Sequence, residues 1–482
     1  MSPSSLPHII LIIMDSVAAK RCSAYGHRRD TTPGLRRIAE QGSLYKYCFA
    51  PSAWTIPSHA SLFTGLYPTQ HGCKSMEWEY PGNYYTLPEI LQGLGYYTAG
   101  ISSNLVISRD ANFNWGFDEF HVMDTLFNSD RYYKMRKEIS SLKKSIKNDF
   151  EEVKLIIGQS FKNSYYSYPL KHLLDRLYRK YRGNITEASY YATERSLTLA
   201  KKLLKAAKDK PLFLFFNFME THGKYNPPKG YDNIIKISKS EKYQVLNLDP
   251  VDFYYNQQIS EPQYEILRLL YEQEIAYLDD RLFDLYNFID QLGLKEQTLF
   301  IVTADHGESL GEHGIWGHIF GLYNELIHIP LIVKYPRQFG LEGEQHRLVQ
   351  LHDLFATLLE ISGAPLPVPE SSRSLLGPPR EFAVSEFPDV SISLMGFQRR
   401  KEPVPRQPFM QPCRGIIDGS LHKLIQWADG SLELYDLAND YAEARNLISQ
   451  PDWQSRTEAL KNKLTELLGP LPLNLSPPPQ LG

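Results

Sequence analysis

Short runs of strand length alternate along this chain with longer stretches of helical periodicity, and this alternation restricts the possible folds more than any other feature. Five runs are interpreted as strands buried on both faces: residues 9–14, 97–102, 212–218, 298–303 and 330–334. Helical periodicity occurs at residues 33–42, 85–94, 188–208 and 263–292. Strands that alternate with helices build a mostly parallel sheet covered by helices on both faces. We therefore predict an α/β fold, an α/β/α sandwich around a mostly parallel sheet.

The last hundred residues show a different pattern. Residues 365–380 are rich in Pro and Ser and resemble a linker. Asp429-Gly430 then stands between two runs of alternating polarity, which is a strong hairpin signal. A helical pattern covers about 451–468. We predict a main domain over 1–375 and a subdomain over 381–482 with a small antiparallel sheet and a terminal helix.

One internal segment is strongly basic although the chain as a whole has a formal net charge of -3. Residues 131–182 contain 14 Lys and Arg against 5 Asp and Glu, together with seven Tyr. We interpret 123–187 as a mostly helical insertion. Three roles for this insertion are open: to cover a site for an anionic substrate, to form a solvated helical face, or to contact an anionic membrane surface. The near balance of charge over the whole chain predicts no nucleic-acid partner.

The first apolar run is a strand and not a targeting signal. Residues 9–14 lack a basic flank and a cleavage site, they end on Asp15, and they are too few to span a bilayer. The four cysteines show no paired spacing, as expected of reduced thiols. They are Cys22, Cys48, Cys73 and Cys413. We therefore expect a cytoplasmic protein without a transmembrane segment.

Polar residues directly follow three of the predicted strands. They are Asp15, the segment 220–222 with His222, and the pair Asp305 and His306. Because ligands of such sheets bind at the carboxyl ends of the strands, these residues are expected to meet. Two carboxylates and an imidazole suit Mn²⁺ or Zn²⁺ and also admit Mg²⁺. We predict one divalent cation, and a second metal is left open.

Thr55 stands just ahead of a predicted short helix. Pro57 near its beginning and Gly65 after its end bracket this helix. The amide groups and dipole of a helix start attract an anion, so a hydroxyl there is placed to attack a phosphoryl or sulfuryl group. Thr55 is therefore a predicted nucleophile and a fourth metal ligand. The alternative is an ordinary helix cap.

Several motifs in order resemble one family. The stretch Trp54–Gly65 is similar to the sulfatase signature, Cys/Ser-x-Pro-x-Arg followed by a helix that ends in Thr-Gly. Met14-Asp15-Ser16 resembles the N-terminal metal-binding strand, and Thr303–Gly314 resembles the second metal motif. Glu433–Leu437 resembles the C-terminal strand. The chain is thus similar to the sulfatase-like branch of the alkaline phosphatase superfamily, which implies an alkaline-phosphatase-like fold with a sulfatase-like catalytic domain.

Three positions depart from the sulfatase pattern. Thr55 stands at the nucleophile position, His59 at the arginine and Ser16 at the second acid. Threonine cannot be oxidised to formylglycine, so we expect none. A threonine there resembles the nucleotide pyrophosphatases, phosphoethanolamine transferases and lipoteichoic acid synthases of the superfamily. The loss of an acid at 16 and the presence of His306 favour Mn²⁺, Zn²⁺ or Mg²⁺ over Ca²⁺.

The resemblance also implies roles for other histidines. His222 matches a histidine that contacts the transferred group or protonates the leaving group. His318 lies near a lysine position of sulfatases, where it would bind a non-bridging oxygen or assist the leaving group. His313 would orient His318 or complete a second metal site. For His59 and His313 a supporting or packing role is equally open, and Ser16 is expected behind the ligands.

These features together predict a metal-dependent hydrolase that cleaves a phosphate mono- or diester through a covalent threonine intermediate. Two alternatives within the enzyme class are a sulfuric ester hydrolase and a soluble phospho-group transferase. A non-catalytic binding protein on the same fold is the alternative from another class. The expected substrate is an anionic ester of a small molecule, a lipid head group or a glycan, and the oligomeric state is left open.

Overall fold

The fold is that of a computed structural model of the chain. It describes residues 6–73, 84–123, 188–207, 210–231, 236–246, 259–318, 320–390 and 407–470, with a few isolated positions between them. The predicted basic insertion, 123–187, lies almost entirely outside these residues and stays a prediction.

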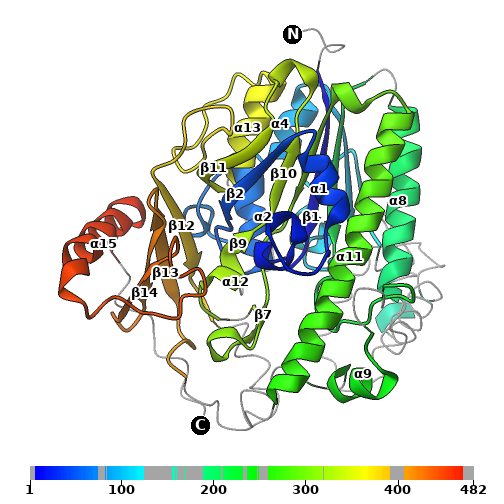
Figure 1. Cartoon of the computed structure of the whole chain (residues 1–482). Coiled ribbons are helices and arrows are strands. Elements are labelled where there is room, and N and C mark those ends of the chain that lie inside the picture. Colours follow the sequence, from blue (N-terminus) through cyan, green and yellow to red (C-terminus); the bar gives the residue numbers. More distant parts are fainter. Residues whose placement is uncertain are drawn as a thin grey trace.

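Among the described residues, nine strands form one central sheet (Figure 1). They are β1 (His8–Met14), β2 (Ser43–Phe49), β3 (Tyr97–Ser102), β4 (Glu119–Val122), β5 (Leu212–Phe218), β6 (Thr298–Thr303), β9 (His328–Ile329), β10 (Leu331–Lys334) and β11 (Gly343–Gln350). Their order is β11-β2-β10-β6-β1-β5-β3-β4, and β9 pairs with β2. All five predicted strands are confirmed.

The sheet is mostly parallel, as predicted. Fully buried β1 lies at its centre, with Ile9 opposite Phe213 of β5 on one side and Leu299 of β6 on the other. Strand β10 runs antiparallel to both β6 and β2. The sequence did not indicate this reversal, because a short apolar run looks the same in either direction.

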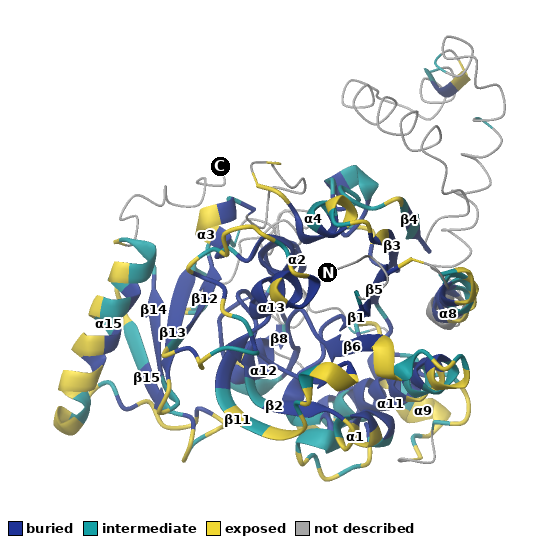
Figure 2. Cartoon of the chain, turned by 90° about the horizontal axis from the view of Figure 1, so that it is seen from above, coloured by how far each residue is buried: buried dark blue, intermediate teal, exposed yellow. Residues whose placement is uncertain are grey.

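Helices cover both faces of the sheet, so the chain forms three layers. One face is covered by α1 (Pro33–Ala39), α8 (Ala188–Ala206) and α11 (Glu261–Gln291), and the other by α2 (Thr55–Thr64), α4 (Leu87–Gly93) and α13 (Asp353–Ser362) (Figure 2). The α/β/α sandwich and the four predicted helices are confirmed. The sheet and both helical layers share one hydrophobic core.

A second sheet follows the sandwich, as predicted. It contains β12 (Phe382–Phe387), β13 (Cys413–Asp418), β14 (His422–Trp427) and β15 (Leu432–Asp436), all antiparallel. Gly430 in the hairpin between β14 and β15 has a φ of 88°, a conformation that glycine adopts without strain. The terminal helix, α15 (Gln454–Leu468), packs on β13 and β14.

The segment 365–380 is not the loose linker that its composition suggested. Arg380 is buried and forms an ion pair with Asp353 of α13. It also donates a hydrogen bond to the carbonyl of Ser371, and Ser372 donates one to the carbonyl of His352. Pro and Ser are therefore used here in a packed connection. The division into domains at 375 and 381 stays a prediction.

Two further expectations concern the whole chain. All four cysteines lie among the described residues, and they are buried and take part in no disulfide. In the part of the chain that is described, no helix has both the length and the apolar character needed to cross a membrane.

Replacing Arg380 by Ala is expected to lower the free energy of unfolding by about 3–5 kcal/mol, because the carboxylate of Asp353 stays buried without its partner. Urea denaturation followed by tryptophan fluorescence measures the change. Arg373→Ala, at an exposed arginine of the same segment, is the control, and its effect should stay within about 0.5 kcal/mol. Equal losses in both variants would contradict a packed role for Arg380.

Candidate active site

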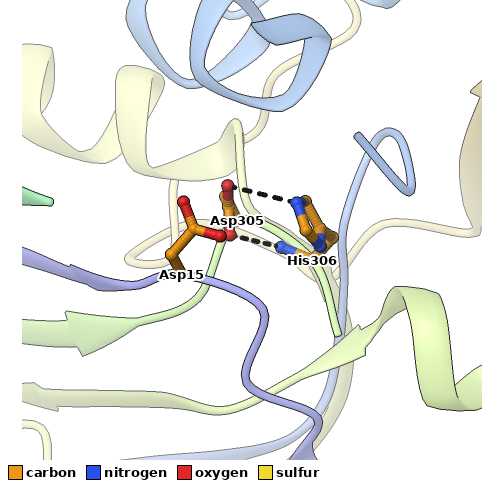
Figure 3. A group of neighbouring side chains, drawn as sticks. All are labelled: Asp15, Asp305 and His306. Carbon is orange, nitrogen blue, oxygen red and sulfur yellow. Dashed lines mark hydrogen bonds and ion pairs between the residues drawn. The ribbon is translucent and has the colours of Figure 1, made fainter. Parts of the chain in front are cut away.

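The carboxyl ends of neighbouring strands bring the predicted metal ligands together. Asp15 follows β1, and Asp305 and His306 follow the adjacent strand β6. The three residues are buried, and each offers a ligand atom within 4.8 Å of the others (Figure 3). The polar residues that follow β1 and β6 therefore lie close together, as predicted.

Ser16 joins the two carboxylates. Its φ of 62° is unusual for a residue with a side chain, and such conformations cluster at functional sites. In this conformation its amide donates to Asp305 Oδ1 at 3.2 Å, while its hydroxyl donates to Asp15 Oδ1 at 2.9 Å. Ser16 thus lies behind the ligands, in the position expected for it.

Asparagines from two further strands hold the other oxygen of Asp15. Asn104 follows β3 and donates from Nδ2 to Asp15 Oδ2 at 2.9 Å. Asn217 lies in β5, and its Nδ2 is 3.5 Å from the same oxygen. Both oxygens of Asp15 are therefore fixed in direction before any ligand binds.

The ring of His306 presents one nitrogen to the site. Its Nδ1 lies 2.9 Å from the carbonyl oxygen of Gly307, so Nδ1 carries the proton and donates it there. The lone pair of Nε2 then points at Thr55 Oγ1, 3.2 Å away, with Asp305 Oδ2 at 3.5 Å. This tautomer is the one that a metal-binding imidazole needs.

Thr55 is the first residue of α2, one position further into the helix than predicted, and Trp54 is the capping residue. All ten residues of α2 are buried, and Gly65 ends the helix with a φ of 73°. The Thr55 side chain therefore projects from a rigid helix start, beside the metal-ligand cluster. An anion bound at Oγ1 would face the positive end of the helix dipole.

His59 uses both ring nitrogens within the protein. Burial lowers the pKa of His59 to about 4, so the ring is neutral near pH 7. Nδ1 donates to the carbonyl oxygen of Thr55 at 2.9 Å, and Nε2 accepts from Asn217 at 3.3 Å. These contacts favour the supporting role for His59 over the direct catalytic role that was also considered.

His318 lies between His306 and His222, next to the metal-ligand cluster. The ring of His318 is 4.3 Å from that of His306 and 5.0 Å from that of His222, measured between centroids. Burial lowers the pKa of His318 well below its usual range, and the neighbouring His306 and His222 lower it further. The centroid of the Trp54 ring lies 5.7 Å from that of His318.

Glu308 is a buried acid that contacts His318. Both of its carboxylate oxygens lie 3.3 Å from His318 Nδ1. Burial raises the pKa of Glu308 to about 7. Since Nδ1 is occupied by this carboxylate, Nε2 of His318 is the nitrogen available to a substrate.

His313 lies apart from these residues. Its Nδ1 is 2.7 Å from Glu325 Oε1, its Nε2 is 3.4 Å from the carbonyl oxygen of Glu443, and its ring stacks on Tyr323. Among the described residues these are the hydrogen bonds of His313, and none goes to His318. The geometry favours the packing role for His313.

The charges of the ligand cluster fit a cation. Burial raises the pKa of Asp305 well above its usual range, and the charge of Asp15 raises it further. Burial would raise the pKa of Asp15 as well, but four nearby histidines hold it below its usual value. Asp305 Oδ2 is buried and accepts no hydrogen bond from any described residue. An unsatisfied carboxylate oxygen beside a second carboxylate and a free imidazole nitrogen is a suitable place for a divalent cation.

Sequence reasoning did not single out Asn104, Asn217 or Glu308. Asn104 obeys the rule already applied, because it follows a predicted strand, and Asn217 is the one polar residue in the apolar run 212–218. Both signals were available. No sequence signal pointed to Glu308, because its importance depends on a contact with His318 that only the fold creates.

Comparison with known protein families shows to which family this chain belongs. The family profile described as Sulfatase matches residues 7–364. The chain belongs to the sulfatase family. A second profile, described as N-sulphoglucosamine sulphohydrolase, C-terminal, matches residues 311–469. The resemblance to the sulfatase-like branch of the alkaline phosphatase superfamily is confirmed, and the chain is a hydrolase of ester bonds.

Curated relatives cover most of this sulfatase-family chain. N-acetylglucosamine-6-O-sulfatase of Bacteroides thetaiotaomicron is 23% identical over 398 residues, 75% of this chain and 68% of its own length. Human iduronate 2-sulfatase is 24% identical over 427 residues, with 75% and 70% covered. The multifunctional alkaline phosphatase superfamily protein PehA of Trinickia caryophylli is 23% identical, with 87% and 86% covered.

Solved structures share the fold. BT4656, in complex with its substrate D-glucosamine-2-N,6-O-disulfate, has a TM-score of 0.65 at 17% identity, with 96% of this chain and 97% of that chain covered. The phosphonate monoester hydrolase of Silicibacter pomeroyi has a TM-score of 0.67 at 16% identity, with 95% and 94% covered. Sulfatase-family enzymes use a divalent metal, and the cluster of Asp15, Asp305 and His306 can hold one.

Replacing Asp305 by Asn tests the cation site. We expect Mn²⁺ or Zn²⁺ to raise the melting temperature of the wild-type protein after chelator treatment, because the cation relieves the repulsion between two buried carboxylates. The Asp305→Asn variant should lose this rise without becoming less stable than the metal-free wild type. Scanning calorimetry with and without metal measures both effects.

Asp284→Asn, at an exposed carboxylate of α11, is the matched control and should keep the metal-induced rise. A rise that persists in Asp305→Asn would place the cation elsewhere.

Proposed function

We propose that this sulfatase-family hydrolase cleaves an anionic phosphate ester, a mono- or diester, with Thr55 as the nucleophile. The observation that carries the proposal is the position of the Thr55 hydroxyl, 3.2 Å from His306 Nε2 at the start of a buried helix. An unmodified hydroxyl placed against a metal-ligand cluster is suited to attack on phosphorus.

In the proposed reaction Thr55 is the nucleophile and His222 transfers protons. Thr55 Oγ1 loses its proton to solvent and attacks phosphorus, forming an oxygen–phosphorus bond while the bond to the leaving oxygen breaks. His222 gives its proton to that oxygen. Water then attacks phosphorus, His222 takes a proton from it, and Thr55 leaves as an alkoxide that regains its proton from solvent.

A divalent cation held by Asp15, Asp305 and His306, with Thr55 as a fourth ligand, would lower the pKa of the hydroxyl and polarise the substrate. Asn104 and Ser16 keep Asp15 directed at that position through their hydrogen bonds. The mixed oxygen and nitrogen donors favour Mn²⁺, Zn²⁺ or Mg²⁺ over Ca²⁺. His318, whose Nδ1 is occupied by Glu308, would bind a non-bridging oxygen through Nε2.

A sulfuric ester is the second candidate substrate, and the named relatives support it better than phosphate, because most of them are sulfatases. The nucleophile supports phosphate. A threonine cannot provide the formylglycine of sulfatases, and hydrolysis of a sulfated threonine is expected to be slow. We give more weight to the nucleophile because it is a property of this chain.

The names of the relatives extend the range of proposed substrates. Some relatives are named for sulfated sugars, so an anionic glycan ester joins lipid head groups and small metabolites as a proposed substrate class. A transferase would use the same intermediate with an alcohol in place of water, and a binding protein would need no hydroxyl at this position. A cytoplasmic location stays a prediction.

Replacing Thr55 by Val removes the hydroxyl at nearly constant volume. We expect activity to fall by more than about a thousandfold with the melting temperature nearly unchanged, because the attacking atom is lost and the packing is kept. Thr55→Ser keeps a hydroxyl and should retain measurable activity. Turnover of p-nitrophenyl phosphate, bis-p-nitrophenyl phosphate and p-nitrophenyl sulfate is measured for each protein.

High-resolution mass spectrometry of quenched wild-type enzyme should find a phosphorylated peptide that contains Thr55. Faster turnover of the sulfate ester, with a sulfated peptide, would replace the first candidate by the second. Wild-type activity in Thr55→Val would reject both.

Replacing His222 by Ala tests the proton donor. Nitrophenolate leaves without help, whereas an alkoxide needs a proton, so the loss of kcat/KM should be about a hundredfold or more for an alkyl ester and much smaller for the nitrophenyl ester. The two esters are compared in one assay series that differs only in the leaving group. Equal losses for both esters would show that His222 is not the proton donor.

A further inference from the structure

Helix α12 (Asn324–Ile327) packs directly on the backbone beside His306. The amide of Gly307 donates to the carbonyl of Leu326 at 2.7 Å. A Cβ added to Gly307 would lie only 2.0 Å from the carbonyl oxygen of Glu325. The position of α12 therefore fixes Gly307, and through it the carbonyl oxygen that orients the ring of His306.

The start of α12 is held by a residue of the C-terminal sheet region. Glu443, in the loop after β15, accepts a hydrogen bond at Oε2 from the amide of Asn324 at 2.7 Å. The side chain of Asn324 donates to the carbonyl of Tyr441 in the same loop at 2.9 Å. This loop thus holds both the main chain and the side chain of the first residue of α12.

Glu443 is fixed by Lys423 of β14. Lys423 Nζ lies 2.6 Å from Glu443 Oε1, and both side chains are fully buried. The same Nζ donates to Asn324 Oδ1 at 3.4 Å. A buried ion pair is weak evidence for stability as such, but it fixes geometry, because neither charge can move away from its partner.

A second connection reaches the same metal-binding loop. His313 lies in the turn between the two strands β7 (Ser309–Leu310) and β8 (Trp316–Gly317), which separate His306 from His318. Its Nδ1 is 2.7 Å from Glu325 Oε1, and its Nε2 is 3.4 Å from the carbonyl oxygen of Glu443. Glu443 is therefore the residue at which contacts to α12 and to this turn converge.

We propose that Glu443 is a positioning residue for the metal site, which acts on His306 through the amide of Asn324 and the packing of α12 against Gly307. The inference rests on the cation site of the proposed function. It assigns to the C-terminal sheet a part in metal binding although that sheet contributes no ligand.

Two double variants separate the hydrogen bond from the ion pair. Lys423→Met with Glu443→Gln removes both charges and keeps an oxygen for the amide of Asn324. Lys423→Met with Glu443→Leu removes the charges and that oxygen at similar volume. We expect the Gln variant to bind Mn²⁺ within about threefold of wild type and the Leu variant to bind about 10–100-fold more weakly, as for residues that orient metal ligands.

Calorimetric titration of the full chain with Mn²⁺ measures binding at a temperature where circular dichroism shows every variant folded. Leu460→Ala is the control, because Leu460 of α15 packs in the C-terminal cluster without contacting α12. It should lower the melting temperature and leave Mn²⁺ affinity unchanged. Wild-type affinity in the Leu double variant would overturn the inference, as would equal weakening by Leu460→Ala.

The inference and the proposed function fail in different ways. Wild-type protein that binds Mn²⁺ but turns over no ester rejects the proposed function, and the comparison of the two double variants still decides the role of Glu443. Wild-type protein that binds neither Mn²⁺ nor Zn²⁺ overturns the inference.

Discussion

Two buried carboxylates, Asp15 and Asp305, lie at the ends of adjacent strands, and the surrounding residues are arranged to make that juxtaposition tolerable. Water cannot solvate them, so positive charge must come from a cation or from protonation. Ser16 and Asn104 direct the oxygens, and Nε2 of His306 lies beside them, 3.5 Å from Asp305 Oδ2. The cluster of side chains is therefore suited to a divalent cation, which would supply that positive charge.

The parts of this site that the sequence predicted are those that follow from strand order. Asp15, Asp305 and His306 come directly after apolar runs, and a parallel sheet brings such positions to one edge. The remaining parts depend on contacts between distant segments. The pairing of Glu308 with His318, the reversed direction of β10 and the burial of Arg380 have no local signature. Local composition even indicated the opposite for Arg380, because Pro and Ser are typical of exposed linkers.

Membership in the sulfatase family and the proposed nucleophile Thr55 point to different substrates, and one fold is compatible with both. The sheet, α2 and the metal ligands define where the reacting group lies, whatever its central atom. The chemistry then depends on a single side chain at the helix start and on the groups around the leaving oxygen. His59 illustrates the point, because the resemblance places it at the arginine position of sulfatases, and its hydrogen bonds among the described residues go to Thr55 and Asn217.

The central place of β1 also has a consequence for biosynthesis. This strand precedes both of its neighbours along the chain, because β5 and β6 begin at residues 212 and 298. At a synthesis rate of about 5–20 residues per second, this mostly apolar strand waits on the order of 10–40 s for its first partner. During that time its backbone groups and side chains are open to other nascent strands. Yield in a foreign host should therefore depend on translation speed and on chaperones that bind the first third of the chain.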